Sequence, residues 1–292
     1  MDAGAPATGT AAPARPGEWG IAPVPASERR LGFVDYFVLW SDLGVGLLVL
    51  LAGTLLVPAL GLAQALLAIL IGSLLGSLLL AWAGLIGSDT GVPTMALLRP
   101  TLGIRGSYLP TVLNLVQLVG WGTFEIIVMA QAADGITKPL LGVSAFPVWV
   151  ILVGAFCTLL AVGGPVRVVR QWLEKFAVWL MLGTSVWLTV VLVTREDFGA
   201  LLWAPGAGGL TFWAAVDLVI AMPVSWIPLV ADYSRFARSG RGAFWGTAAG
   251  YLLANVWFYA LGAGLLLALK VQDLIAAIMS TAGGWLALGI IL

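Results

Sequence analysis

The stretch AMPVSWIPLVADYSRFARSGR, residues 221–241, decides how the chain must fold. It lies in a long apolar run, yet carries Pro223 and Pro228, and after Asp232 three arginines follow within ten residues. Proline removes a backbone donor and its ring clashes with the preceding turn, so this pair predicts a local unwinding of the helix. At membrane depth, unwound backbone is tolerated only where it is buried in protein or lines a cavity. The stretch therefore predicts a broken transmembrane helix, with a ligand cavity or a packing kink at its break.

The composition of the whole chain is that of a membrane protein. Of its 292 residues, 61% are hydrophobic and 10% are charged, and the mean hydropathy is +1.03. A soluble domain of this length does not have that balance. The interval between Asp42 and Asp89 contains no charge and has room for two helical spans of about 20 residues each. We predict an all-α polytopic membrane protein.

Apolar windows bounded by charges, glycines and prolines predict seven spans and the start of an eighth. We expect the spans at residues 38–58, 61–86, 109–133, 145–164, 171–193, 211–231 and 243–269. The eighth apolar segment begins after Asp273. The final residues, 289–292, lie in an apolar run without a polar tail, which favours a C-terminally truncated chain over a span that ends at the C-terminus.

The first 30 residues are rich in Ala, Pro and Gly and have no apolar h-region, which a signal peptide requires. We therefore expect residues 1–34 to form a disordered tail and residues 35–292 to form the transmembrane domain. Basic residues indicate the orientation, because eleven of the fourteen Lys and Arg fall in the tail or after the second, fourth and sixth spans. By the positive-inside rule the N-terminus is cytoplasmic, and we expect a multi-pass protein of the cell membrane.

The sequence contains few of the residue types that enzymes use for catalysis. It has no histidine, and its one cysteine, Cys157, lies in the apolar run 146–162, where a buried thiol that fills a packing gap is expected. A disulfide within the chain, a metal site and a Ser/His or Cys/His catalytic pair are thereby excluded. We predict a protein that is not an enzyme and that has no cofactor and no nucleic-acid partner.

Polar residues inside a span are candidates for function, because lipid satisfies no hydrogen bond. Asn114, Gln117, Trp121 and Glu125 follow one another at spacings of three, four and four in the third span. At about 100° per residue they share one face, within an arc of roughly 80°. This stripe predicts a binding site, although Asn and Gln can also join helices by hydrogen bonds, the interpretation we favour for Asn114.

Two spans are weakened in their middle. In the sixth, the break exposes Ser225 and Trp226, whose hydroxyl and flat indole suit a planar ring. In the first, Gly44 and Gly46 precede a second loosened segment at residues 53–58. Broken helices at corresponding positions of two halves indicate the midplane site of a transporter, here with five-helix units of opposite orientation.

Four segments of the chain resemble a known family. The segments ADYSRFAR, 231–238, and TGVPTMALLRPTLGIRGSYLP, 90–110, resemble the nucleobase–cation symporter family 1. The segments NLVQLVGWGTFEIIVMAQAAD, 114–134, and AGTLLVPALG, 52–61, look most like its hydroxymethylpyrimidine and cytosine permease branch. The resemblance runs from about Leu31 to the end of the chain.

The resemblance implies a five-plus-five inverted-repeat fold, with the first repeat complete in this chain and the second partial. It also implies a planar heterocycle bound between helices 1, 3, 6 and 8 and a coupling cation between helices 1 and 8. Carried over to this chain, the substrate-binding positions are Gln117, Trp121, Glu125, Pro223, Ser225 and Trp226. The backbone carbonyls near Gly44 and Val45 would bind the cation. The second part of helix 8, which completes both sites in the family, falls beyond the end of this sequence.

Two hypotheses follow. The first is a secondary transporter that imports a pyrimidine-type base or hydroxymethylpyrimidine, driven by Na⁺ or H⁺. The second is a non-transporting membrane scaffold or an inactive fragment of such a permease. At the end of the sixth span, we expect Asp232 to pair with Arg235. Cytosine, hydroxymethylpyrimidine, a purine and a hydantoin are all planar, and a stacking tryptophan accepts any of them.

Overall fold

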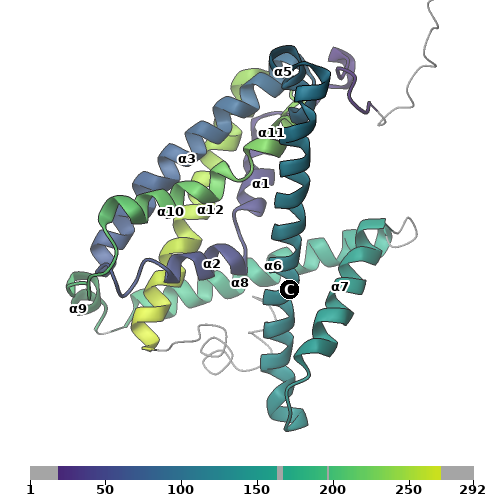
Figure 1. Ribbon diagram of the computed structural model, residues 1–292. Coiled ribbons are helices and arrows are strands. Elements are labelled where there is room, and N and C mark those ends of the chain that lie inside the picture. Colours follow the sequence, from purple (N-terminus) through teal and green to yellow (C-terminus); the bar gives the residue numbers. More distant parts are fainter. Residues whose placement is uncertain (1–18, 163–166, 196, 271–292) are drawn as a thin grey trace, which may run out of the picture.

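The computed structural model describes residues 19–162, 167–195 and 197–270 (Figure 1). Within these ranges the regular elements are helices, and Leu31 and Ala237 form an isolated β-bridge. The eighth apolar segment and the first 18 residues of the expected tail lie outside the described residues.

Each of the seven expected spans coincides with one helix or with a pair of helices. In chain order they are α1 (Phe33–Leu43) with α2 (Leu47–Thr54), α3 (Leu62–Thr90), α6 (Tyr108–Leu141), α7 (Phe146–Val162), α8 (Arg167–Val193), α10 (Phe212–Val224) with α11 (Ile227–Ser234), and α12 (Gly240–Leu269). The shorter helices η1 (Ala26–Glu28), α4 (Thr94–Leu97), α5 (Arg99–Gly106) and α9 (Phe198–Trp203) lie between them.

By length and composition, four of the described helices could cross a membrane: α3, α6, α12 and the continuous stretch 212–234. The pair α1 and α2 makes a fifth if it counts as one span bent by 59°. Helix α7 and the part of α8 from Met181 to Val193 are apolar but shorter. The all-α membrane architecture predicted from hydropathy is confirmed.

The largest difference in boundary is at the end of α6, which continues to Leu141 although the third span was expected to end at residue 133. Hydropathy falls at Asp134 and Lys138, but charged residues do not stop a helix. The stop comes at Gly142, whose φ of +73° closes the helix with a left-handed cap. Its N–H donates to the carbonyl of Lys138.

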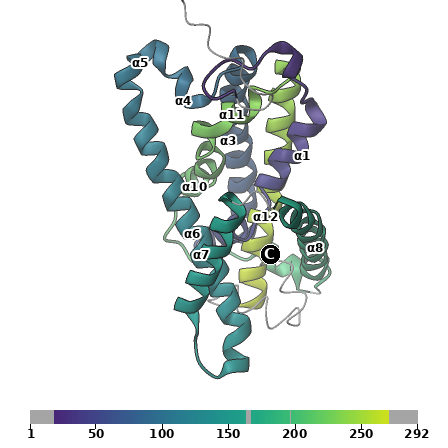
Figure 2. The ribbon, with the colours of Figure 1, turned by 90° about the vertical axis from the view of Figure 1, so that its right-hand side faces the viewer.

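The core lies where α3 and α12 pack against each other, with α1, α2, α10 and α11 around them (Figure 1). Its largest fully buried side chains include Tyr36, Trp40, Tyr251 and Phe258. Helices α6 and α7 pack on each other and stand beside this core, as Figure 2 shows. This arrangement leaves the inner face of α6 opposite the two broken spans.

Small residues allow the broken sixth span to lie close to α3. A Cβ atom at Gly76 would overlap the ring of Pro223, and one at Gly72 would lie 2.7 Å from the Cβ of Val219. In membrane helices such small residues let backbones approach and gain dispersion contacts. Pro223 is therefore buried against α3.

Residues 19–34 pack on the rest of the described chain, which differs from the disorder expected for this part of the tail. Val24 is buried, and its N–H donates to the carbonyl of Gly91, at 2.9 Å. Arg29 donates to the carbonyl of Ser88 at 3.0 Å, where α3 leaves its last carbonyls without partners. The composition of the tail did not reveal this segment, because a few anchoring residues are averaged away among many Ala, Pro and Gly.

Candidate functional site

The sixth span is interrupted at Ser225 and Trp226, between α10 and α11. Both residues keep near-helical backbone angles, so the break is a tight turn and the helix is not extensively unwound. The N–H of Leu229 donates to the carbonyl of Trp226, three residues back. The carbonyl of Ser225 instead accepts a hydrogen bond from Nε2 of Gln117 on α6, at 2.7 Å.

The two prolines explain why one break forms instead of two. Pro228 lies in the first turn of α11, where a backbone N–H has no helical partner in any case. Pro223 lies inside α10 and is accommodated by the space at Gly76. The helical hydrogen-bonding pattern is therefore interrupted once, between the two prolines.

The first span is interrupted more sharply. Gly46 has extended backbone (φ −179°, ψ 160°) between α1 and α2. Within the described chain, the carbonyls of Leu43, Gly44 and Val45 accept no backbone hydrogen bond. The first turn of α2 likewise presents unbonded N–H groups, so a partly negative and a partly positive helix end meet at this break.

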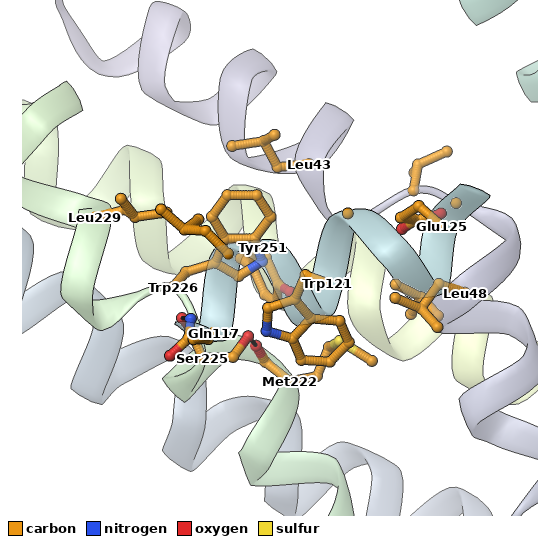
Figure 3. A pocket seen from close by; sticks show the side chains of 15 residues that line it. Leu43, Leu48, Gln117, Trp121, Glu125, Met222, Ser225, Trp226, Leu229 and Tyr251 are labelled. Atoms are coloured by element: carbon orange, nitrogen blue, oxygen red, sulfur yellow. Dashed lines mark hydrogen bonds between the residues drawn. The ribbon is translucent and has the colours of Figure 1, made fainter. Parts of the chain in front are cut away.

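A cavity of about 290 Å³ lies between the two breaks and α6 (Figure 3). Six helices, α1, α2, α6, α10, α11 and α12, and the two breaks provide its lining residues. These residues are Leu43, Val45, Gly46, Leu48, Val49, Gln117, Leu118, Trp121, Gly122, Glu125, Met222, Ser225, Trp226, Leu229 and Tyr251. Most of these are apolar, and the polar groups are few and separate. This is the general character of a small-molecule site.

The polar and aromatic groups are spread along the cavity. Gln117 and Ser225 are joined at one end. Glu125 comes eight residues after Gln117, about 12 Å further along the axis of α6. Trp121, Trp226 and Tyr251 lie between these ends in Figure 3. The arrangement offers flat apolar faces with hydrogen-bonding groups at the rim, which suits a planar polar ring.

Comparison with known proteins identifies the family. The model of the family described as permeases for cytosine/purines, uracil, thiamine and allantoin matches residues 23–282. The chain belongs to this family. Membership confirms the resemblance to the nucleobase–cation symporters, and this family consists of permeases and not of enzymes.

Among related permeases, the cytosine permease of Escherichia coli K12 is 31% identical over 215 residues, which are 71% of this chain and 48% of the relative. The hydantoin permease of Microbacterium maritypicum is 23% identical over 214 residues, 72% of this chain and 43% of the relative. The chain thus spans about half the length of these permeases.

Two solved structures share the fold. They are Mhp1, a nucleobase-cation-symport-1 family transporter, closed with bromovinylhydantoin bound (TM-score 0.77, 20% identity), and Mhp1 in its inward-facing conformation (0.80, 21%). The chain aligns with these two structures over 93% and 92% of its own length, and over 64% and 63% of theirs. The transporter fold is confirmed, and its inverted repeat remains a prediction.

The structure brings most of the predicted site residues together. Gln117, Trp121, Glu125, Ser225 and Trp226 line the cavity, as does Val45.

Two other predicted residues do not line it. Pro223 precedes Ser225 by two residues, about 200° around the helix, and so faces α3. Gly44 packs against α12, where an added Cβ would lie 2.8 Å from the Cβ of Ala254. Asn114, favoured as a link between helices, is also outside the lining, and its Oδ1 has no partner within the described residues.

Sequence reasoning missed Tyr251, which reaches the cavity from the middle of α12. The sequence contained a signal for this residue, because Tyr251 is a polar aromatic residue within an apolar span, one turn before Asn255.

The expected pair of Asp232 and Arg235 is wrong. Asp232 accepts from the N–H of Thr94 at 3.1 Å, while Arg235 donates to the carbonyl of Gly20 at 2.7 Å. The N-terminal segment and α4 come close to the end of α11, and neither contact could be foreseen from local spacing.

Proposed function

We propose that this permease is a secondary transporter that imports a pyrimidine-type nucleobase or hydroxymethylpyrimidine across the cell membrane, driven by Na⁺ or H⁺. One observation carries the proposal: a cavity at the junction of two broken spans is lined by two tryptophans and by separate hydrogen-bonding groups. Broken spans that meet at a cavity are how transporters of this architecture build their substrate sites. The volume of about 290 Å³ lies at the lower end for ligand pockets, which favours a single ring.

The hydrogen bonds within the site indicate which groups remain for a substrate. Gln117 already uses Nε2 on the Ser225 carbonyl, so its Oε1 is left to accept from a ring N–H. The hydroxyl of Ser225 donates to the carbonyl of Met222 at 2.7 Å and can still accept. Both groups therefore favour a ring with N–H donors on its edge, and either indole can stack on its face.

The coupling ion has two candidate positions. The unbonded carbonyls of Gly44 and Val45 are oxygen ligands at the partly negative end of α1, which suits Na⁺. The carboxyl group of Glu125 would serve H⁺ instead. The distribution of basic residues predicts a cytoplasmic N-terminus. The inward gradient of the coupling ion would set the direction of import.

The first test compares Trp226→Ala with Trp213→Ala in purified protein. Trp226 lines the cavity, whereas Trp213, on the same span, is 70% exposed and serves as the matched control. Stacking of a base on an aromatic side chain contributes about 1–3 kcal/mol, so Trp226→Ala should weaken binding of the preferred ring at least fivefold. Trp213→Ala should leave the affinity unchanged.

Binding is measured by calorimetry with cytosine, uracil, hydroxymethylpyrimidine and hydantoin. Wild-type affinity in Trp226→Ala would contradict the assigned role of this indole. If well-folded wild-type protein binds none of the four rings, the second hypothesis, a non-transporting scaffold or inactive permease, replaces the first.

A further inference from the structure

Within the described chain, the hydroxyl proton of Tyr251 has no acceptor. Its side chain is fully buried in the middle of α12, yet it lines the cavity. Its hydroxyl lies beside the Trp226 side chain but makes no hydrogen bond of good geometry within the described chain. A buried hydroxyl without a partner costs about 1–3 kcal/mol, so such a group in a native site calls for a ligand or a bound water.

The phenol ring is held in place by neighbouring aromatic rings. Tyr251 meets Trp40 edge to face at 6.0 Å between ring centroids, and Trp40 meets Trp226 in the same way at 5.9 Å. Trp40 is itself fully buried. Tyr251 is therefore fixed relative to the indole that we propose as a stacking surface, so little entropy is lost when its hydroxyl binds a ligand.

The other hydroxyl that lines the cavity is already committed. Ser225 donates its proton to Met222, and the Glu125 carboxylate, when ionised, can only accept. Tyr251 can donate to a ligand oxygen from a position beside the ring-stacking surface. The cavity thus has acceptors for ring N–H groups, on Gln117 and Ser225, and a free donor for a ring carbonyl, on Tyr251.

We propose that the Tyr251 hydroxyl donates a hydrogen bond to a carbonyl oxygen of the bound ring and thereby makes the permease selective for oxo-pyrimidines and related cyclic amides. This inference rests on the proposed function and narrows it: cytosine, uracil and hydantoin carry such a carbonyl, whereas hydroxymethylpyrimidine does not. A site that hydrogen-bonds a substrate group rejects analogues without that group, because its own polar group is then left unpaired.

The experiment compares Tyr251→Phe with Tyr259→Phe in the full-length protein. Both substitutions remove one oxygen and keep the ring. Tyr259 lies two turns further along α12, outside the cavity lining, and its hydroxyl donates to the carbonyl of Leu218 at 3.4 Å. The ligands are cytosine and 4-aminopyrimidine, which is cytosine without its carbonyl oxygen. Dissociation constants and thermal midpoints are measured for each variant.

We expect Tyr251→Phe to weaken cytosine binding about fivefold, as the loss of one hydrogen bond of about 1 kcal/mol implies. The affinity for 4-aminopyrimidine should not change, and Tyr259→Phe should bind both ligands as the wild type does. Unchanged cytosine affinity in Tyr251→Phe would overturn the inference. So would an equal loss for both ligands, or a loss shared with Tyr259→Phe, since these results indicate a structural role.

The result for the wild type separates this inference from the proposed function. If the wild type binds cytosine, hydantoin or uracil and Tyr251→Phe does so equally well, the function stands and the role of Tyr251 fails. If the folded wild type binds none of these rings, both fail together.

Discussion

Glu125 is the carboxyl group of the cavity, and no residue of the described chain forms an ion pair with it. It lies about two helical turns from Gln117, at the end away from the linked pair of Gln117 and Ser225. A ring held between the two tryptophans and the polar end would leave this carboxyl group free. At this position Glu125 is better placed to relay a proton than to contact the substrate.

Glu125→Gln should therefore keep the affinity for the preferred ring within about twofold, because the amide preserves the shape and most of the hydrogen bonding of the side chain. Uptake driven by H⁺ should lose its rise toward acid pH on the outside, because the amide cannot carry a proton. The measurements are ring binding and the pH dependence of uptake. A loss of binding together with unchanged pH dependence would instead make Glu125 a substrate contact.

Single residues of the site were predictable where they share a local period. The polar stripe of α6 follows from spacings of three and four residues. Pro223 was assigned to the site, although the same 100° step places it on a different side of the helix from Ser225. The position of Tyr251 does not follow, because it depends on how α12 packs against α1. Local spacing also failed for Asp232, whose partner Thr94 is far away in the sequence.

Between elements, the closest approach that supports the site is that of α3 and α10. Gly76→Ala would place a methyl group against the ring of Pro223, which has little freedom to move. Overpacking of this kind costs about 1–3 kcal/mol, so the thermal midpoint of the purified protein should fall.

The matched control is Gly120→Ala on α6, where nothing lies within 4 Å of the added carbon. There the substitution should leave stability unchanged or raise it slightly, since alanine favours a helix by about 0.5–1 kcal/mol over glycine. Equal thermal midpoints for the two variants would show that the close packing of α10 against Gly76 does not contribute to stability.

The N-terminal segment provides a second prediction for the elements. Arg29 donates to the carbonyls of Val24 and Ser88 and thereby joins the segment to the end of α3. Arg29→Ala should expose residues 19–32 to proteolysis and lower the thermal midpoint, because the last carbonyls of α3 lose a cationic cap.

Arg30→Ala is the comparison variant, because Arg30 is exposed and forms a 3.6 Å ion pair with Glu28 at the surface. Such surface pairs contribute little, so this change should have no measurable effect. Similar protease sensitivity in both variants would contradict the role given to Arg29.

At the scale of elements, hydropathy located a helix or a helix pair at each of the seven expected spans, because lipid demands about 20 apolar residues per crossing. It could not fix the ends, as α6 shows by running eight residues beyond its expected end through Asp134 and Lys138. Nor could it reveal the single turn at Ser225, because the cost of Pro223 is offset by a glycine on another helix.

For the whole molecule, the sequence predicted the class and the family but not the arrangement of the helices. The family follows from short motifs whose residues the structure places at the ends of α3 and α11, where the backbone of Thr94 and Ala231 is tied by hydrogen bonds. That α6, with α7 packed on it, stands beside the core and faces the broken spans across a cavity depends on long-range packing. The inverted repeat and the cytoplasmic N-terminus remain predictions.

The most direct test of the account is counterflow of radiolabelled ring in proteoliposomes. Vesicles loaded with unlabelled cytosine or uracil receive a trace of the labelled base outside, and internal label is followed with time. We predict transient accumulation above that of protein-free vesicles, abolished in Trp226→Ala and retained in Trp213→Ala. Label no higher than in protein-free vesicles, from wild-type protein that binds the ring, would contradict transport and leave a binding protein without a transport cycle.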